Sequence, residues 1–342
     1  KSTGNVIDPI EFMDKYGADA LRFTLARGAN PGTDQALAED WIGGSRNFAT
    51  KLWNATRFAM MNGANVSGAL PEASTLNAID RWILSRLSET LRDVDQLLEN
   101  YEFARASETL YHFAWDDLCD WYLELSKESF ASGGAKNSQR VLGHVLDQLL
   151  RLMHPFMPFL TEEIWHFLKD RSPNEALIVS TWPEKVSYDS TILESFDFAA
   201  EVVSGIRNLR KQKQIPFKTA VELHVINKAS FSKTFDGLIS KLGNISNIYY
   251  TSSAVDKAFS FRVKSNEYYM LADMLIDIDA ELAKLEEELT YTKGFLLSVQ
   301  KKLSNERFVN NAPAQVVASE KKKEADALAK IDTLETSLSN LR

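Results

Sequence analysis

Apolar residues recur at helical spacing through roughly the first half of the chain. One stripe runs from Phe48 to Ala59, and segments with the same period follow at 79–94, 102–130, 136–153 and from residue 161 onward. Repeats of three or four residues place apolar side chains on one face of an α-helix. Helices joined by short links predict an antiparallel bundle. Thr161, followed by two glutamates, is expected to cap the last helix.

A different pattern begins near residue 190. A helical stretch, 192–213, is expected to stop at Ile215-Pro216, because the residue before a proline disfavours the helical conformation. Segments 221–226 and 259–263 then alternate apolar and polar positions, as strands do. All seven tryptophans lie in the first 182 residues, and this change of composition supports a domain boundary. We expect a small α/β subdomain here.

From residue 278 the apolar positions have the spacing of a coiled coil. Intervals of four and three residues alternate along Ile278, Leu282, Leu285, Leu289, Thr292, Leu296, Val299 and Leu303. After an interruption, Pro313 fits the first turn of a second helix, and the pattern resumes at Leu328, Ile331, Leu334, Leu338 and Leu341. The short turn predicts an antiparallel hairpin with arms of roughly 40 Å.

These patterns predict a mainly α protein with four regions. They are a linking segment (1–40), an antiparallel helix bundle (41–185), a small α/β connector (190–277) and a coiled-coil arm (278–342).

Composition excludes several classes of protein. With 342 residues, 44% hydrophobic and 25% charged, the chain is neither disordered nor collagen-like. Its single cysteine, Cys119, cannot form an internal disulfide or a multi-cysteine zinc site, and it fits the reducing cytoplasm. No apolar run is long enough to span a membrane. The chain begins at Lys1 without an initiator methionine, as a piece of a longer protein would.

The charge is unevenly distributed. The net charge is −8, yet acidic residues are almost absent from 41–71, 129–146, 202–221 and 289–319, where only Glu306 occurs. One such stretch is usually a solvated helix face. Four of them over three predicted units favour a long polyanionic partner. RNA fits better than a membrane, because no helix pairs basic residues with an exposed apolar face along its whole length.

The helix near residues 45–58 has a polar face that could bind bases. Asn47, Lys51 and Asn54 are spaced by four and three residues, opposite the apolar stripe. Asparagine is a poor helix former, so two on one helix face require an explanation. Asparagine can hydrogen-bond base edges, and arginine or aromatic planes can stack on unpaired bases. Alternatively, these side chains bond across the bundle or to nearby backbone.

Evidence for a complete catalytic site is weak. The five histidines have neither the spacing of a Ser/His/Asp triad nor that of metal ligands. Asp116, Asp117 and Asp120 resemble a carboxylate cluster, but we expect them to cap helices or pair with bundle arginines rather than to bind a metal. Only residues 1–5 have a catalytic character, since a lysine with small neighbours on a loop can hold nucleotide phosphates.

Several motifs resemble the carboxyl-terminal part of class I aminoacyl-tRNA synthetases. Lys1-Ser2 resembles the end of the KMSKS signature, and YGADALRF (16–23) matches a block of that family. Segment 46–58 resembles its anticodon-domain helix. Further markers are DDLCDWYLE (116–124), HPFMPF (154–159), 206–216 and 302–313. The resemblance covers essentially the whole chain, and implies an anticodon-binding helix bundle, a small α/β connector and a coiled-coil arm.

The terminal hairpin indicates the bacterial valyl-tRNA synthetases within this class. Isoleucyl enzymes of many bacteria end in a cysteine-ligated zinc module, and leucyl enzymes end in a compact module without the hairpin. The carboxyl-terminal part of an isoleucyl- or leucyl-tRNA synthetase is the first alternative. A non-catalytic cytoplasmic scaffold that dimerises through its coiled coil is an alternative of another class.

The resemblance implies tRNA(Val) as the partner, and neither DNA nor a membrane. Candidate anticodon contacts are Asn47, Lys51, Asn54, Arg57 and Phe58. Candidate contacts to the tRNA elbow or backbone are Lys293, Lys301, Lys302 and Arg307.

The parent enzyme implied by the resemblance is a monomer that activates valine with ATP and Mg²⁺ and esterifies it to tRNA(Val). Lys1 would stabilise charge on the ATP phosphates, with Ser2 beside it. The nucleotide-binding fold and the editing domain would precede Lys1. The fragment alone is therefore expected to be inactive and to bind no cofactor or metal.

Overall fold

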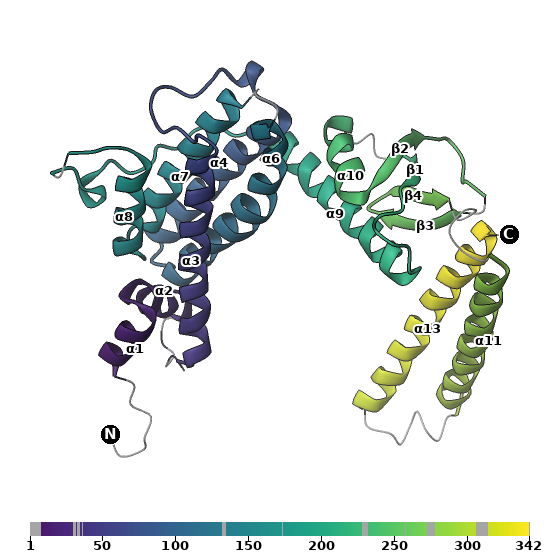
Figure 1. The fold of residues 1–342 in the computed structure, drawn as a ribbon. Coiled ribbons are helices and arrows are strands. Elements are labelled where there is room, and N and C mark those ends of the chain that lie inside the picture. The colour runs from purple at the N-terminus through teal and green to yellow at the C-terminus, as the bar shows by residue number, and fades with distance from the viewer. Residues whose placement is uncertain are drawn as a thin grey trace, which may run out of the picture. The chain divides into compact units, whose positions relative to one another are not determined.

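The chain divides into two compact units, residues 1–194 and 195–342, which are considered separately below (Figure 1). The computed structural model describes residues 8–29, 32, 35, 37–131, 135–172, 174–227, 232–256, 258–271, 278–305 and 314–341. The finer division into four regions stays a prediction.

The first unit is the predicted helix bundle. Helix α3 (Glu39–Met61) spans it lengthwise, with α1 (Pro9–Tyr16) and α2 (Ala18–Gly28) at its amino-terminal end (Figure 1). The remaining elements are η1 (Ala73–Thr75), α4 (Ala78–Glu99), α5 (Phe103–His112), η2 (Phe113–Tyr122), α6 (Leu123–Ala131), α7 (Lys136–Met153), α8 (Pro158–Leu168) and η3 (Leu177–Val179). Helix α7 has the bounds that the apolar period predicts.

The apolar stripes of these helices form the core. Phe48 and Leu52 of α3 are almost completely buried, as are Trp82 of α4, Leu118 of η2 and Leu146 of α7. Removing such a side chain from water contributes about 1.5–3 kcal/mol to stability. This burial fixes the side of α3 that faces inward, and with it the polar side that remains outside.

The expected cap at Thr161 is wrong. Helix α8 begins at Pro158, which occupies the first helical turn, and Met157 precedes it. Proline suits this position because its fixed φ is helical and it has no N–H to leave unpaired. Thr161 lies inside the helix, where its hydroxyl donates to the Met157 carbonyl at 2.8 Å.

The segment 103–131 is helical throughout, but it is not a single α-helix. Between α5 and α6 the ten residues of η2 form a π-helix. In π-helices the hydrogen bonds join residues five apart, and such segments are rare and frequently occur at functional sites. The apolar period of the sequence did not reveal this change.

The second unit contains most of α9 (Ser190–Gln212) and a mixed sheet of strand order β2-β1-β4-β3. The strands are β1 (Val221–Ile226), β2 (Ile245–Tyr250), β3 (Ala258–Val263) and β4 (Asn266–Leu271), with η4 (Lys233–Phe235) and α10 (Asp236–Gly243) between β1 and β2. Strands β1 and β2 are parallel, and the other pairs are antiparallel. The Phe261 ring packs on Gly205, where a Cβ would lie 2.4 Å from Cε2, so α9 lies close to β3.

The predicted strands β1 and β3 are confirmed, whereas β2 and β4 were not predicted. Strand β2 is an edge strand that buries only its first residue, so it has no apolar alternation. Strand β4 is buried at most positions, and its sequence NEYYML therefore does not alternate either.

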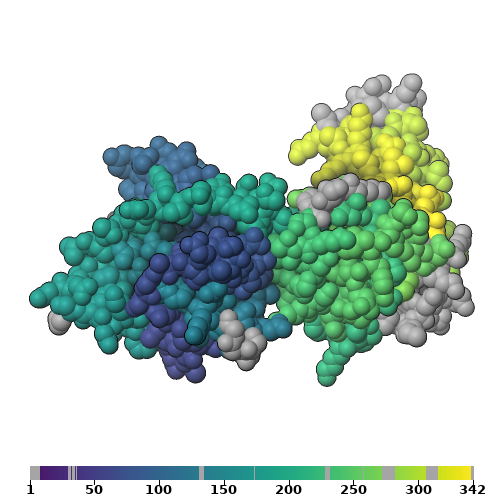
Figure 2. Space-filling view, turned by 90° about the horizontal axis from the view of Figure 1, so that it is seen from above, coloured from purple at the N-terminus to yellow at the C-terminus, as the bar shows by residue number. Residues whose placement is uncertain are grey.

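Helices α11 (Ile278–Leu303) and α13 (Ala314–Leu341) pack on each other as a hairpin that projects from the sheet (Figure 1). In the space-filling view the yellow residues of α13 protrude from the green part of the same unit (Figure 2). Ion pairs Lys293–Glu335 (2.6 Å) and Lys302–Glu320 (3.7 Å) link the helices in antiparallel order, because the partner in α13 comes earlier as the lysine in α11 comes later. The predicted seam of α11 is confirmed, since Leu285, Thr292 and Val299 are buried. Pro313 lies outside the described residues.

The predicted seam of α13 needs one correction. Leu328 is 49% exposed, and the neighbouring Ala327 is buried in its place. From there the seam continues through Leu334 and Leu338, both buried, as predicted. Toward the turn it includes Glu320, which is only 6% exposed. Alanine and glutamate are not recognised as seam residues by their hydrophobicity. The sequence pattern therefore assigned the seam position to Leu328, the leucine next to Ala327.

Candidate nucleic-acid interface

The polar face of α3 carries the candidate anticodon residues. Asn47, Asn54 and Arg57 are exposed, and across the residues that the structure describes their side chains make no hydrogen bond or ion pair. Phe58 is partly buried, its ring 6.3 Å from that of Phe130. Three of the five candidates are therefore presented outward with free polar groups. The alternative that they bond across the bundle does not hold for these three.

Lys51 differs, because it bonds across the bundle. Its Nζ lies 2.6 Å from Oδ1 of Asp120 and 3.6 Å from the ring centre of Trp115. The Lys51 side chain is 24% exposed and that of Asp120 54%. An ion pair this open to solvent contributes at most about 1 kcal/mol, so a phosphate can displace the carboxylate at little cost.

The π-helix explains how one cation contacts both residues. Trp115 and Asp120 are five residues apart, which in an α-helix would place them far apart around the axis. Hydrogen bonding between residues five apart brings them onto one face of η2, toward α3. Asp117 and Tyr122 have the same separation and both face α4, where Asp117 lies 3.8 Å from Arg86.

Sequence reasoning missed a stack of rings and cations beside this face. The Arg27 guanidinium lies 4.1 Å from the centre of the Tyr111 ring, which stacks on Trp115 at 5.6 Å. Lys51 closes the other end of the stack, and Glu108 pairs with Arg27 at 2.6 Å. The spacing of Tyr111 and Trp115 by four residues was a visible signal, but the two cations come from α2 and α3.

The carboxylates 116, 117 and 120 contact three different side chains. Asp116 lies 2.7 Å from Nδ1 of His112, Asp117 contacts Arg86 and Asp120 contacts Lys51. The expected pairing with a bundle arginine is thus confirmed for Asp117, whereas Asp116 and Asp120 contact a histidine and a lysine. Within the described ranges, no group of three His, Cys, Asp or Glu residues has the geometry of a metal site. Burial raises the pKa of the nearby Cys119 thiol to about 12.

A buried carboxylate joins three elements of the bundle. Asp80, 1% exposed, accepts hydrogen bonds from Tyr122 Oη (2.7 Å), Ser138 Oγ (2.8 Å) and Asn77 Nδ2 (2.8 Å). Burial raises the pKa of Asp80, although the hydrogen bonds from Tyr122 and Ser138 oppose that shift. The network ties the start of α4 to the end of η2 and the start of α7, and so holds η2 against the bundle.

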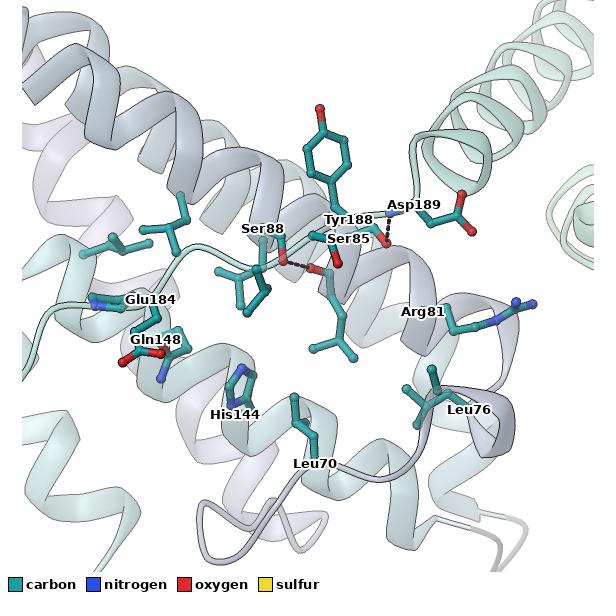
Figure 3. A pocket seen from close by; sticks show the side chains of 18 of the residues that line it. Leu70, Leu76, Arg81, Ser85, Ser88, His144, Gln148, Glu184, Tyr188 and Asp189 are labelled. Carbon is teal, nitrogen blue, oxygen red and sulfur yellow. Dashed lines mark hydrogen bonds between the residues drawn. The ribbon is translucent and has the colours of Figure 1, made fainter.

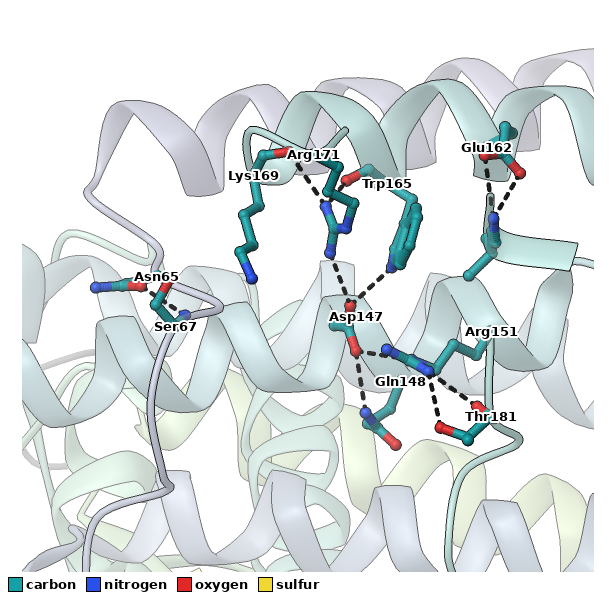
Figure 4. Close-up of polar contacts among 11 residues, drawn as sticks. Asn65, Ser67, Asp147, Gln148, Arg151, Glu162, Trp165, Lys169, Arg171 and Thr181 are labelled. Carbon is teal, nitrogen blue, oxygen red and sulfur yellow. Dashed lines mark hydrogen bonds and ion pairs between the residues drawn. The ribbon is translucent and has the colours of Figure 1, made fainter. Parts of the chain in front are cut away.

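In the second acid-poor stretch, 129–146, Arg140 has a structural role. Its guanidinium donates to the carbonyls of Asn65 (2.8 Å) and Ala69 (3.0 Å), and also to that of Gly68. Farther along α7, the Asp147 carboxylate accepts hydrogen bonds from Arg151, Arg171 and Trp165 (Figure 4). These contacts hold the loops on the bundle, which argues against Arg140 as a contact for nucleic acid.

A cavity of 970 Å³ lies between α4, α7 and the segment 181–189 (Figure 3). Leucines form much of its wall, and His144 is directed into it. Burial lowers the pKa of His144, so the ring is neutral at pH 7. None of the candidate tRNA contacts lines this cavity, and it is separate from the polar face of α3.

The candidate residues of the arm differ in how freely they are presented. Lys301 is exposed, and its side chain makes no hydrogen bond or ion pair with any of the residues described, whereas Lys302 lies 3.7 Å from Glu320 and Lys293 pairs with Glu335. Arg307 lies outside the described residues, as do Lys1 and Ser2. The expected nucleotide contacts of Lys1 and Ser2 therefore stay a prediction.

No helix in the described part of the chain is both long and apolar enough to cross a bilayer.

Three family models match separate parts of the chain. The model of the anticodon-binding domain of tRNA ligase matches residues 80–226. The valyl tRNA synthetase tRNA binding arm matches residues 277–342. The class I tRNA synthetases specific for I, L, M and V match residues 1–38.

Curated proteins that are similar to this chain over 93–100% of its length are named valine–tRNA ligase. The valine–tRNA ligase of Christiangramia forsetii is 43% identical over 341 residues, which are 100% of this chain and 39% of that protein. Those of Streptomyces coelicolor and Bacillus subtilis are 42% and 38% identical, over 93% and 100% of this chain and 36% and 40% of theirs. The chain thus spans 36–40% of the length of these relatives.

Among solved structures, the LeuRS–tRNA–LeuAMS ternary complex from Agrobacterium radiobacter has a TM-score of 0.45 and 23% identity. The match covers 56% of this chain and 22% of that one, and at this distance it carries no argument.

Proposed function

The chain belongs to the valine–tRNA ligases, whose carboxyl-terminal part it matches, and from this premise we propose that it binds tRNA(Val) at the anticodon and at the elbow. The exposed and unbonded asparagines of α3 carry the proposal, because buried or bonded amides could not read a base. The residues concerned are Asn47 and Asn54.

At the anticodon, each candidate residue has a distinct role. Asn47 and Asn54 hydrogen-bond base edges, Arg57 binds phosphate and Phe58 stacks on an unpaired base. Lys51 exchanges the Asp120 carboxylate for a phosphate. These residues lie on the acid-free stretch 41–71, so no carboxylate of that stretch repels the RNA.

At the elbow, the lysines near the turn of the hairpin bind the sugar-phosphate backbone. Lys301 and Lys302 lie in the last turn of α11, where Lys301 is exposed and the Nζ atom of Lys302 lies 3.7 Å from Glu320. Lys293 lies farther from the turn and must give up Glu335 to bind RNA. Two separate contacts on one tRNA strengthen binding without new interactions at either site.

The whole protein, in this proposal, esterifies valine to tRNA(Val) in the cytoplasm with ATP as the energy source. Its relatives carry the name valine–tRNA ligase, and class I synthetases use ATP. The part of the chain described by the structure contributes tRNA recognition to this reaction.

Filter binding with tRNA(Val) transcripts tests the proposal. The chain should bind tRNA(Val) more tightly than transcripts with isoleucine or leucine anticodons. Asn47→Ala with Asn54→Ala should reduce affinity by about thirtyfold or more, since each of the two base contacts contributes about 1–3 kcal/mol. Asn174→Ala, an exposed asparagine away from α3, is the control.

The alternatives give different results. Preference for a swapped anticodon would assign the chain to isoleucine or leucine. No tRNA binding, together with a mass in solution that rises with concentration, would favour the scaffold.

A further inference from the structure

Arg210, near the end of α9, is a buried cation without an acidic partner. It is 3% exposed, and its guanidinium donates to four backbone carbonyls: those of Gly243 (3.1 Å), Pro216 (3.1 Å), Thr219 (2.9 Å) and Asn244 (3.0 Å). It makes no ion pair with any carboxylate in the described ranges. Burying an unpaired charge is costly unless hydrogen bonds replace the lost water, and the four carbonyls supply that replacement.

These bonds hold the loop after α9 in one conformation. Two of the carbonyls belong to the loop 213–220 and two to the end of α10. Asn244, in the left-handed conformation at φ 49°, donates its side-chain amide to the Phe217 carbonyl at 2.6 Å. Two separate segments of backbone are thus fixed to the end of α9 through carbonyls that accept from Arg210.

The outer side of this loop is basic and carries one exposed ring. Arg207, Lys211 and Lys218 are exposed, and among the described residues none has a hydrogen-bonding or acidic partner for its side chain. Phe217 is 56% exposed. The sequence contains no Asp or Glu from Val202 to Val221. An acidic partner for Arg210 would have held the loop equally well, but it would have cancelled a positive charge.

We propose that this surface, the α9 loop surface formed by Arg207, Lys211, Phe217 and Lys218, binds the phosphate backbone of RNA as a third tRNA contact. The proposal rests on the proposed function and adds a contact that lies in neither the α3 face nor the arm. The cations bind phosphates, and Phe217 stacks on a base or packs on a ribose. Because the loop is already ordered, little conformational entropy is lost on binding.

RNA fits this surface better than a bilayer or a protein. A bilayer-binding helix needs an apolar face along its length, whereas Phe217 is the exposed ring of this loop and the inner face of α9 is occupied by the core residues Val203 and Ile206. Several exposed cations beside one exposed ring fit an RNA strand, which presents phosphates and bases together.

The test measures the salt dependence of tRNA(Val) binding by the full chain. Arg207→Gln, Lys211→Gln and Lys218→Gln together should lower the slope of log K against log salt by about 2–3, at about 0.7–0.9 per lost phosphate contact. The charge-preserving triple variant, Arg207→Lys, Lys211→Arg and Lys218→Arg, is the matched control and should keep the slope. Circular dichroism of all variants shows whether the sheet unit remains folded.

The results of this experiment distinguish a failure of this inference from a failure of the proposed function. An unchanged slope in the neutral variant, with anticodon discrimination intact, overturns this inference and leaves the proposed function standing. Failure of the unmodified chain to bind tRNA(Val) overturns both. Binding to phosphatidylserine vesicles that is lost in the neutral variant, while tRNA binding is unchanged, assigns the surface to a membrane and overturns the inference.

Discussion

The Nζ atom of Lys51 lies 2.6 Å from Oδ1 of Asp120, so the central cation of the α3 face is paired with an acid. The Trp115 ring beneath Lys51 adds a cation–π contact at 3.6 Å. Lys51 is therefore held in position, and its charge is partly cancelled. A phosphate that replaces Asp120 finds the ammonium already oriented.

Replacing Asp120 by asparagine should strengthen tRNA binding. The variant removes the competing carboxylate, and an exposed ion pair is worth about 0.2–1 kcal/mol, so affinity should rise by about fivefold at most. Filter binding at low salt measures the change. Asp116→Asn is the control, because Asp116 pairs with His112 and not with Lys51. Weaker binding by Asp120→Asn would mean that Asp120 positions Lys51 and does not compete with RNA.

Reversing two charges near the hairpin turn should weaken tRNA binding. Lys301→Glu with Lys302→Glu removes two candidate phosphate contacts, so the salt slope should fall by about 1–2. The control Lys284→Glu changes an exposed lysine near the other end of α11. Equal affinity and slope for the double variant and the unmodified chain would remove the arm from the tRNA-binding surface.

The stability of the bundle should depend on pH through Asp80. Burial raises the pKa of this carboxyl, so above the ordinary value of 3.8 the folded state binds more protons than the unfolded state. The stability advantage of the unmodified chain over Asp80→Asn should therefore be largest near pH 4 and decrease as pH rises toward 7. Urea unfolding followed by tryptophan fluorescence measures it, and all seven tryptophans lie in this unit.

The comparison needs no further variant, because every other titratable group is present in both proteins and its contribution to the pH dependence of stability cancels in the difference. A stability difference that stays constant between pH 4 and 7 would show that Asp80 does not titrate in this range.

Gly143→Ala should destabilise the bundle. A Cβ at this position of α7 would lie 2.3 Å from the Asn65 carbonyl oxygen, which is backbone and cannot rotate away. Overpacking of this kind costs about 1–3 kcal/mol, measured by the same fluorescence. Gly44→Ala is the control, since nothing lies within 4 Å of its Cβ, and in the helix α3 it should stabilise by up to about 1 kcal/mol. Equal unfolding midpoints for both variants would contradict the tight approach at Gly143.

The sequence predicted those elements whose burial is one-sided. The stripe of Phe48 and Leu52 placed α3 correctly, and the alternation of β1 did the same for the sheet. Prediction failed where burial is nearly complete or nearly absent, as in β4 and β2. It also failed on the α13 seam, where Ala327 and Glu320 occupy positions that hydrophobicity assigns to leucine.

The candidate site was predictable only in part, for a related reason. Asn47 and Asn54 share one helix, so their spacing shows that they share a face. The contacts of Lys51 with Trp115 and Asp120 depend on a π-helical turn and on the packing of η2 against α3. Neither is encoded in the local spacing of apolar residues.

The π-helix makes the length of the segment 113–122 as important as its side chains. The π-helix has more residues per turn than α5 and α6 on either side of it, so it changes the direction in which the residues of α6 face relative to those of α5. Loss of one residue would rotate the residues that follow it by roughly 100° about the helix axis. One set of partners, either Lys51 with α3 or Asp80 with α4, would then face the wrong way. Substitutions in this segment remove single contacts, whereas a one-residue deletion would break the contacts with α3 or those with α4 all at once.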